Sequence, residues 1–342
     1  MDDLAAANSW LVGLVAALAA AGATTWVVLL GRKLRGLPFL QFQSRRPVPW
    51  GAVGAGVAML MVLMSLGSAF LGAEPAIDPL DSPLDMAEGI VQSALLVAVV
   101  TGLFVMIVIS AGASIVDLGL PRYAHELVRD ARIGAVAWLA TLIPVYGLQA
   151  LLVQVLQQPS QHPLIHMILE NPHPVLLGAS FFPSVIVAPI SHELAFLLLL
   201  QGWLERLCAN HRSALDADRG EIIAYDSASA AAGNVNSLQI AGMVDPQDTS
   251  TSPTAVHPVG NDNPSARAGG LPYGWVPILV SSALFALAHL GHGPDPFALF
   301  LLALLLGYVY QRTHRIVPCI VTHMLFNAAS LGALLLVIAG AK

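Results

Sequence analysis

Charge is scarce in this chain of 342 residues, because Asp, Glu, Lys and Arg together make up only 11%. Soluble globular domains carry about 25%. Hydrophobic residues reach 56% and lie in long runs. The shortage of charge excludes an ordinary soluble domain and predicts an all-α, multi-spanning membrane protein whose surroundings are a lipid bilayer. We expect no nucleic-acid partner.

Cysteine is also scarce, and the two cysteines, Cys208 and Cys319, each lie at the end of an apolar segment. This number excludes a disulfide framework and a cysteine-based zinc site. The first residues, 1–9, contain no Lys or Arg, whereas a secretory signal begins with a basic region. We therefore interpret the first apolar run as a retained transmembrane helix.

The apolar runs predict a helical bundle of about eight transmembrane helices, since most approach the roughly 20 residues that cross a bilayer. The runs are 10–30, 51–72, 90–113, 133–156, 175–207, 275–290, 297–310 and 316–338. Pro183 and Pro189 interrupt the fifth run. That run is either one kinked helix or a short span followed by an interfacial helix.

The distribution of basic residues predicts the orientation. With eight spans and an outside N-terminus, every Lys and Arg except Lys342 falls on the inner side. This asymmetry is what the positive-inside rule requires. We expect a multi-pass protein of the cell membrane with both termini outside.

Composition divides the chain into four parts. Residues 1–174 hold the N-terminal transmembrane helices, 175–208 the fifth apolar block, 209–272 a polar insertion and 273–342 the C-terminal transmembrane helices. The insertion is rich in Ser, Ala, Gly, Asn, Asp and Pro and cannot bury enough apolar surface to offset the entropy of ordering. It is predicted to be disordered.

Three of the apolar runs carry polar residues that hydrocarbon cannot satisfy. His323 and Asn327 are four residues apart and so share one helical face. His289 ends an earlier run, and His192 and Glu193 lie in the fifth. Such residues can be hydrogen-bonded packing contacts between helices, but ionisable groups within a membrane more often mark a functional site.

These residues lie in segments that resemble the CPBP family, the intramembrane endopeptidases that include the type II CAAX-prenyl proteases. The first motif of that family resembles residues 188–196, Ala-Pro-Ile-Ser-His-Glu-Leu-Ala-Phe. The second motif, Phe-x-x-x-His, matches Phe285 and His289, and the third, His-x-x-x-Asn, matches His323 and Asn327. The resemblance extends over about 175–335, interrupted by the insertion.

The resemblance implies a peptidase that cleaves a peptide bond in a membrane-associated or lipid-modified polypeptide. In the family, the first of two adjacent glutamates activates water together with the second-motif histidine. The third-motif His and Asn stabilise the oxyanion. Here His192 occupies the first glutamate position, and Leu197 the position of a family arginine.

The residues leave three alternatives for the first motif. Glu193 can act as the base, although it lies about 100° round the helix from the family position. His192 can act as the base instead, and in a variant of this alternative His192, His289 and His323 bind zinc while Glu193 polarises its water. In the third alternative the chain is inactive and serves as a membrane binding or regulatory protein. The zinc question therefore stays open at this point.

Positions of the other histidines are also predicted. The two runs that flank 291–296 are short, and a hairpin that stops below the outer surface would bring His289 to the level of His323. His292 is interpreted as a turn residue, His162 as a solvated surface residue and His314 as a neighbour of the inner-face headgroups.

Overall fold

The structure, a computed structural model, describes residues 2–71, 82–160, 162–170, 172–214 and 270–340. Within these ranges the regular secondary structure is entirely helical. Among the described residues, six helices are long and apolar enough to cross a membrane, and two shorter apolar helices accompany them. The predicted all-α membrane bundle is confirmed, whereas the number of eight spans and their orientation stay predictions.

The helices follow the order of the apolar runs, except that α5 lies between the fourth and fifth runs, where the sequence predicted a loop. The helices before the fifth run are α1 (Asp2–Leu34), α2 (Val53–Leu71), α3 (Pro83–Ser110), α4 (Ala124–Leu156) and α5 (Pro163–Glu170). The fifth run contains α6 (Pro174–Phe181), η1 (Phe182–Val187), α7 (Ala188–His192) and η2 (Glu193–Gln201). The last three helices are α10 (Val276–Leu287), α11 (Asp295–Thr313) and α12 (Ile316–Gly340).

The fifth run forms one long helix, Pro174–Ala214, and not a span followed by an interfacial helix. Its η1 and η2 segments are π-helical. Proline lacks an N–H and its ring clashes with the carbonyl four residues earlier, so a wider turn lets a helix continue past it. Pro183 lies within η1 and Pro189 just before η2. Helix continues to Ala214, inside the predicted insertion, whose remaining residues 215–269 lie outside the described ranges.

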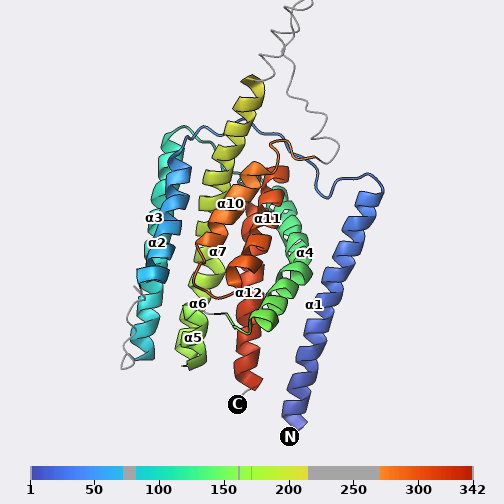
Figure 1. Ribbon diagram of the computed structural model, residues 1–342, viewed down its shortest axis with the longest axis vertical. Coiled ribbons are helices and arrows are strands. Elements are labelled where there is room, and N and C mark those ends of the chain that lie inside the picture. The colour runs from blue at the N-terminus through green and yellow to red at the C-terminus, as the bar shows by residue number, and fades with distance from the viewer. Residues whose placement is uncertain (1, 72–81, 161, 171, 215–269, 341–342) are drawn as a thin grey trace, which may run out of the picture.

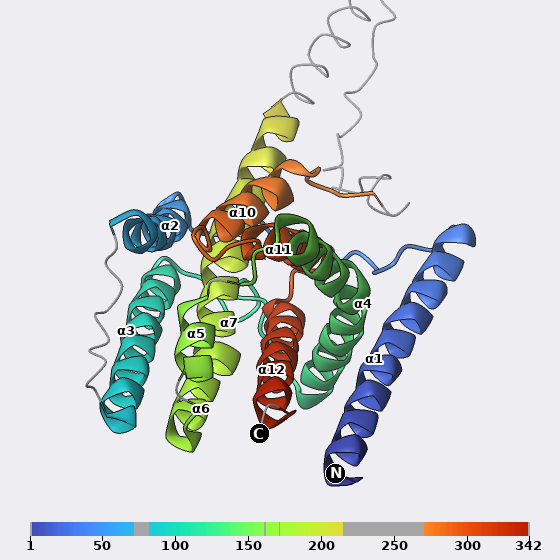
Figure 2. The same cartoon turned by 60° about the horizontal axis from the view of Figure 1, so that its bottom comes forward.

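The start of α1 and the end of α12 lie at the same end of the bundle (Figure 1). Helix α1 packs against α4 along one side, while α2 and α3 lie at the opposite side and contact the fifth-run helix (Figure 2). Helices α10, α11 and α12 occupy the centre. The three motif-bearing segments are therefore surrounded by other helices.

At the end of the bundle opposite the termini, arginine hydrogen bonds connect the loop segments to the helices. The buried guanidinium of Arg45 donates to the Tyr310 hydroxyl at 2.8 Å and to Glu205 at 2.9 Å. Arg312 donates to the backbone carbonyl oxygens of Leu40 and Gly270. These basic residues, which the sequence suggests are loop charges, are structural parts of the bundle.

Two polar residues near this end are buried, although both lie between apolar runs in the sequence, where solvent exposure is expected. His314, predicted among headgroups, is 4% exposed, and its Nδ1 lies 2.6 Å from the carbonyl oxygen of Gln43. Burial and the Arg45 charge lower the pKa of His314. Asp117 is 3% exposed, and hydrogen bonds from Arg46 hold the pKa of its carboxyl below the usual range.

Helices α4 and α12 pack in close contact at Gly134. A Cβ atom there would lie 2.7 Å from the Pro318 carbonyl oxygen, and Thr322 donates its hydroxyl to the Gly134 carbonyl at 3.0 Å. Small residues let membrane helices approach in this way. One turn away, Arg315 binds the fully buried Asp130, with Nη2 2.7 Å from Oδ2. These contacts fix the height of α12 and therefore of His323.

Candidate functional site

The first and third motifs meet at Glu193 and His323. The Nδ1 atom of His323 lies 2.7 Å from Oε1 of Glu193. Both residues are buried, at 3% and 2% exposure. Glu193 begins the π-helical segment η2, whose wider turns change the direction in which successive side chains project. Glu193 lies about 100° round a regular helix from the family position, and the π-helical turns that begin at Glu193 change this offset.

His192 lies beside the same residues but forms no comparable hydrogen bond. Its ring centroid is 5.4 Å from that of His289 and 5.8 Å from that of His323. Its Nδ1 atom is buried and lacks a hydrogen-bond partner among the described residues. An unpaired buried nitrogen is uncommon and marks a place where a ligand, a water or a rearrangement supplies the missing partner.

His289 lies in the turn that follows α10. Its Nδ1 is 2.8 Å from the backbone carbonyl oxygen of Phe285, an arrangement in which Nδ1–H donates and Nε2 can accept a proton. The Phe285 ring lies between the imidazoles, with its centroid 4.8 Å from His289 and 5.8 Å from His323. The short hairpin thus brings His289 into the same layer as His323, as the sequence predicted.

Asn327 lies one turn further along α12 and binds backbone. Its amide donates to the carbonyl oxygen of Ser184 at 2.8 Å. Ser184 belongs to η1, where π-helical hydrogen bonding leaves backbone groups in unusual directions. In this arrangement Asn327 holds α12 against the fifth-run helix. All five predicted site residues lie in one region, but Asn327 contacts backbone and not the other four side chains.

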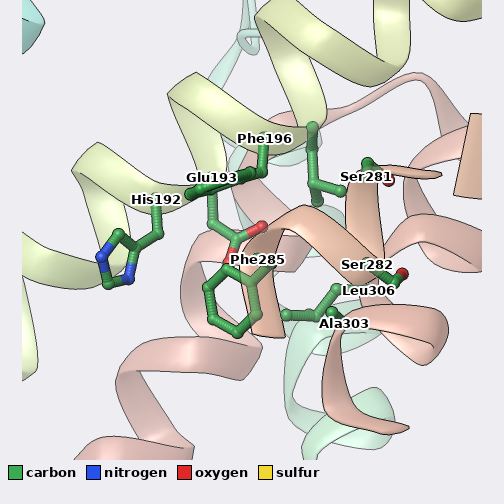
Figure 3. Close-up of a pocket in the computed structure, with 9 residues that line it drawn as sticks. His192, Glu193, Phe196, Ser281, Ser282, Phe285, Ala303 and Leu306 are labelled. Atoms are coloured by element: carbon green, nitrogen blue, oxygen red, sulfur yellow. The ribbon is translucent and has the colours of Figure 1, made fainter. Parts of the chain in front are cut away.

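A small cavity adjoins Glu193 and is lined by His192 as well (Figure 3). Its volume is about 10 Å³, close to the volume that one water molecule needs. Helix η2 contributes Glu193 and Phe196, and α10 contributes Ser282 and Phe285. The site as it stands holds space for a water molecule and none for a peptide.

A group of buried polar residues that the sequence analysis did not single out lies next to this cavity. Ser281 donates to Gln201 Oε1 at 3.1 Å, and Gln201 Nε2 donates to the Gly307 carbonyl at 2.9 Å and to Glu205 at 3.0 Å. Gln201 and Glu205 lie four residues apart in the same long apolar helix. Their occurrence within an apolar run was the available signal, by the same rule that identified His323.

The outer histidines differ from their sequence interpretation. The ring of His162, predicted to be solvated, is half-buried and lies 4.7 Å from the ring of His292. The His292 ring in turn lies 6.0 Å from that of His289. Burial first, and then the neighbouring His292 and His166, lower the pKa of His162 to about 4. His162 is therefore a packed residue beside the candidate site.

Zinc binding by His192, His289 and His323 requires nitrogen atoms that converge to about 2.0–2.1 Å from one point. In the described part of the chain, no group of three or more His, Cys, Asp or Glu side chains is arranged to hold a metal ion. The Nδ1 atoms of His289 and His323 are already used in hydrogen bonds. The residues as placed do not fit zinc, and no step below is derived through it.

Comparison with known proteins agrees with the motif positions. Residues 265–329 match a family model described as type II CAAX prenyl endopeptidase Rce1-like. This range contains Phe285, His289, His323 and Asn327 and ends before the last turns of α12. No curated protein and no solved structure matches the chain significantly. Together with the second and third motifs, the match supports membership of the CPBP family, which includes the type II CAAX-prenyl endopeptidases.

Proposed function

We propose that the chain is an intramembrane endopeptidase that hydrolyses a peptide bond in a membrane-associated or lipid-modified polypeptide. The observation that carries this proposal is the buried contact between Glu193 and His323 at 2.7 Å. A carboxylate and an imidazole at hydrogen-bond distance form a typical catalytic pair, in which one group acts as general base and the other orients it. Burial away from water makes such a pair costly unless it is used or fully satisfied.

In the proposed mechanism Glu193 is the general base. His323 donates from Nδ1 to Oε1, so the second carboxylate oxygen is the atom that takes a proton from the attacking water. The hydroxide adds to the scissile carbonyl carbon and forms a tetrahedral oxyanion. The proton then passes to the leaving nitrogen as the C–N bond breaks, with Nε2 of His289 as a carrier. Glu193 is ionised again once the amine leaves.

Glu193 is preferred to His192 because of their hydrogen bonds. The carboxylate of Glu193 is oriented by His323, whereas Nδ1 of His192 has no hydrogen-bond partner among the described residues. Substrate must displace part of the packing, since the cavity has a volume of about 10 Å³. A peptide would enter between helices and place its carbonyl beside Glu193. The proposal includes a cell-membrane location with both termini outside.

The decisive experiment measures cleavage of a lipid-anchored peptide by the purified chain in lipid nanodiscs. Glu193→Gln is expected to lower kcat at least about 100-fold, the usual contribution of a general base. His323→Ala and His289→Ala are expected to lower it as well. Glu88→Gln is a matched control, because Glu88 is an exposed glutamate on α3 that accepts a hydrogen bond from Gln92 and lies outside the candidate site. Unchanged cleavage in Glu193→Gln, with equal expression, would end this assignment.

An inactive binding protein is the alternative, and one observation favours it. Leu197 occupies the family's arginine position and is packed in the apolar core at 4% exposure. With His192 at the first glutamate position, two charged groups of the family motif are missing. Under this alternative the wild-type chain binds the lipid-anchored peptide and releases it uncut, which the same nanodisc assay detects as bound, intact substrate.

A further inference from the structure

One backbone carbonyl of the fifth-run helix lacks the helical donors that normally satisfy it. In a π-helical turn the Ser184 carbonyl would accept from the amide five residues later, but residue 189 is proline and has no N–H. The amide four residues later is already used, because the Ala188 N–H donates to the Pro183 carbonyl. The Ser184 carbonyl therefore needs a partner from outside its own helix, since leaving it unpaired costs free energy.

The side chain of Asn327 on α12 is this partner, and its amide donates to the Ser184 carbonyl at 2.8 Å. A side-chain amide N–H binds a backbone carbonyl oxygen in the same way whether the carbonyl belongs to the protein or to a bound peptide. Asn327 lies four residues after His323, on the same face of α12. The amide that Ser184 occupies is thus next to the Glu193–His323 pair.

The contact lies at the edge of the site, in the seam between η1 and α12. Ser184 and Asn327 are half-buried, whereas Glu193 and His323 are buried. Figure 2 shows α12 with α4 on one side and α6, which leads into η1, on the other. The α4 side is held by polar contacts at three levels, namely Arg315–Asp130, Thr322–Gly134 and Tyr146–Phe326. Parting η1 from α12 disrupts fewer of the polar contacts described above than parting α4 from α12.

We propose that the hydrogen bond between Asn327 and Ser184 is an autoinhibitory latch, which a membrane-embedded polypeptide opens when it enters the site between η1 and α12. The inference rests on the proposed function, because it concerns how the polypeptide reaches Glu193. A site with a cavity of about 10 Å³ must open to admit a peptide. On opening, α6 and η1 move away from α12 about Pro189, and the Glu193–His323 contact beyond Pro189 is kept. A carbonyl oxygen of the peptide then accepts the Asn327 amide in place of Ser184.

Pro189→Ala tests the latch, because alanine restores the N–H that the Ser184 carbonyl lacks. The restored amide competes with Asn327, so the open form becomes more populated and the peptide binds more tightly. Affinity for a lipid-anchored peptide is measured in nanodiscs with Glu193→Gln chains, which are expected to bind the peptide without cutting it. Pro189→Ala is expected to lower Kd about tenfold, the equivalent of one hydrogen bond. An unchanged or higher Kd overturns the proposal.

Pro144→Ala is the matched control. Pro144 is a proline inside α4, another helix long enough to cross the membrane, and it lies outside the seam. Replacing it also removes a proline from a membrane helix, but it supplies no donor to Ser184. Its Kd is expected to equal that of the parent chain, so an equal gain in both variants overturns the proposal.

A second measurement reports the opening directly and needs no hydrolysis. Spin labels are attached to Val175→Cys on α6 and Leu335→Cys on α12, two exposed positions, in a Cys208→Ser chain whose Cys319 is fully buried. Added peptide is expected to produce a longer distance between the labels, and Pro189→Ala is expected to populate this distance without peptide. Distances that neither change alters overturn the latch even if the chain is an active peptidase. If the wild-type chain cleaves no peptide, the proposed function fails, and the latch is decided by these distances.

Discussion

The imidazole of His323 and the carboxylate of Glu193 lie 2.7 Å apart although 130 positions separate them in the sequence. The contact joins α12 to the long fifth-run helix at the depth where both are enclosed by other helices. Its geometry depends on two features outside the motifs. One is the π-helical winding of η2, which sets the direction of the Glu193 side chain. The other is the position of α12 along its own axis, which is determined by its contacts with α4. Changes in those contacts are expected to alter the site without touching it.

Gly134→Ala is expected to lower both stability and cleavage. The new Cβ would lie 2.7 Å from the Pro318 carbonyl oxygen and 2.8 Å from Val321 Cβ, so α12 must move. Forced repacking of this kind costs about 1–3 kcal/mol. The displacement also lengthens the contact between His323 and Glu193. Thermal unfolding in detergent and the nanodisc cleavage assay measure the two effects.

Gly147→Ala provides the control within the same helix. Among the described residues, no heavy atom apart from the chain neighbours and the helix's own nearby backbone lies within 4 Å of a Cβ at that position. Alanine is the better helix former, so this variant is expected to be about 0.5–1 kcal/mol more stable and equally active. Equal stability of the two alanine variants would contradict the close approach of α4 and α12.

Asp130→Asn is expected to destabilise the chain by about 3 kcal/mol, because it leaves the Arg315 guanidinium without its main buried partner. Arg315 Nε donates to Asp130 Oδ2 at 2.8 Å, and Asp130 is 0% exposed. Denaturant unfolding in mixed micelles measures the loss. Glu126→Gln, which weakens the longer 3.2 Å contact of Arg315 at the solvent-accessible edge of this site, is expected to lower stability much less than Asp130→Asn does. A similar loss in both variants would contradict the dominant role of Asp130.

Apolar run length predicted the helical class and the positions of the long helices, but it missed α5. Motif spacing predicted that His192, Glu193, His289 and His323 lie close together. These features follow from local sequence, since lipid requires internally hydrogen-bonded helices. The directions in which side chains project from the fifth-run helix could not be predicted. Pro183 and Pro189 indicated an irregularity, but the choice between a kink and a π-helical turn depends on the neighbouring helices.

The buried arginines show a second limit of the sequence argument. Arg45, Arg312 and Arg315 counted as inner-side loop charges, which is how the positive-inside rule treats them. Each is in fact held by a partner distant in sequence, such as Glu205 for Arg45 and Asp130 for Arg315. A single sequence contains no signal for such pairs, because partner choice is decided by packing. The orientation prediction therefore rests on residues that also have structural roles.

Acidification is expected to destabilise the fold through His162. Its pKa is lowered from 6.5 to about 4, first by burial and then by His292 and His166. The folded state thus binds the proton less readily than the unfolded state does. The stabilising effect is complete above about pH 6.5 and is lost as the pH falls toward about 4, with a total of about 3 kcal/mol. Thermal midpoints across this pH range measure the loss.

His162→Asn removes this titration and keeps an acceptor for the Leu164 N–H, which His162 Nδ1 binds at 3.2 Å. The variant is expected to show a flatter decline in midpoint between about pH 6.5 and 4. His125→Asn, at an exposed position on α4, is the control and is expected to keep the wild-type slope. An unchanged slope in His162→Asn would show that other groups carry the acid sensitivity.

The first-motif substitution can be tested by restoring the family residue. His192→Glu places two carboxylates side by side, and one of them is expected to hold a proton because adjacent like charges do not both ionise. The single change is preferable to a double change with Leu197→Arg. Leu197 is 4% exposed, so an arginine there would be an unpaired charge in the apolar core and would destabilise the fold by several kcal/mol.

If Glu193 is the base, His192→Glu retains cleavage or raises it, because the Glu193–His323 contact is left in place. His192→Phe, which keeps a ring beside Phe285 and His289, is then expected to retain cleavage within about threefold, a change below 1 kcal/mol in the barrier. A loss of at least about 100-fold in both variants would transfer the role of base to His192. Cleavage by His192→Glu but not by the wild type would instead identify the natural chain as an inactive member whose remaining site is intact.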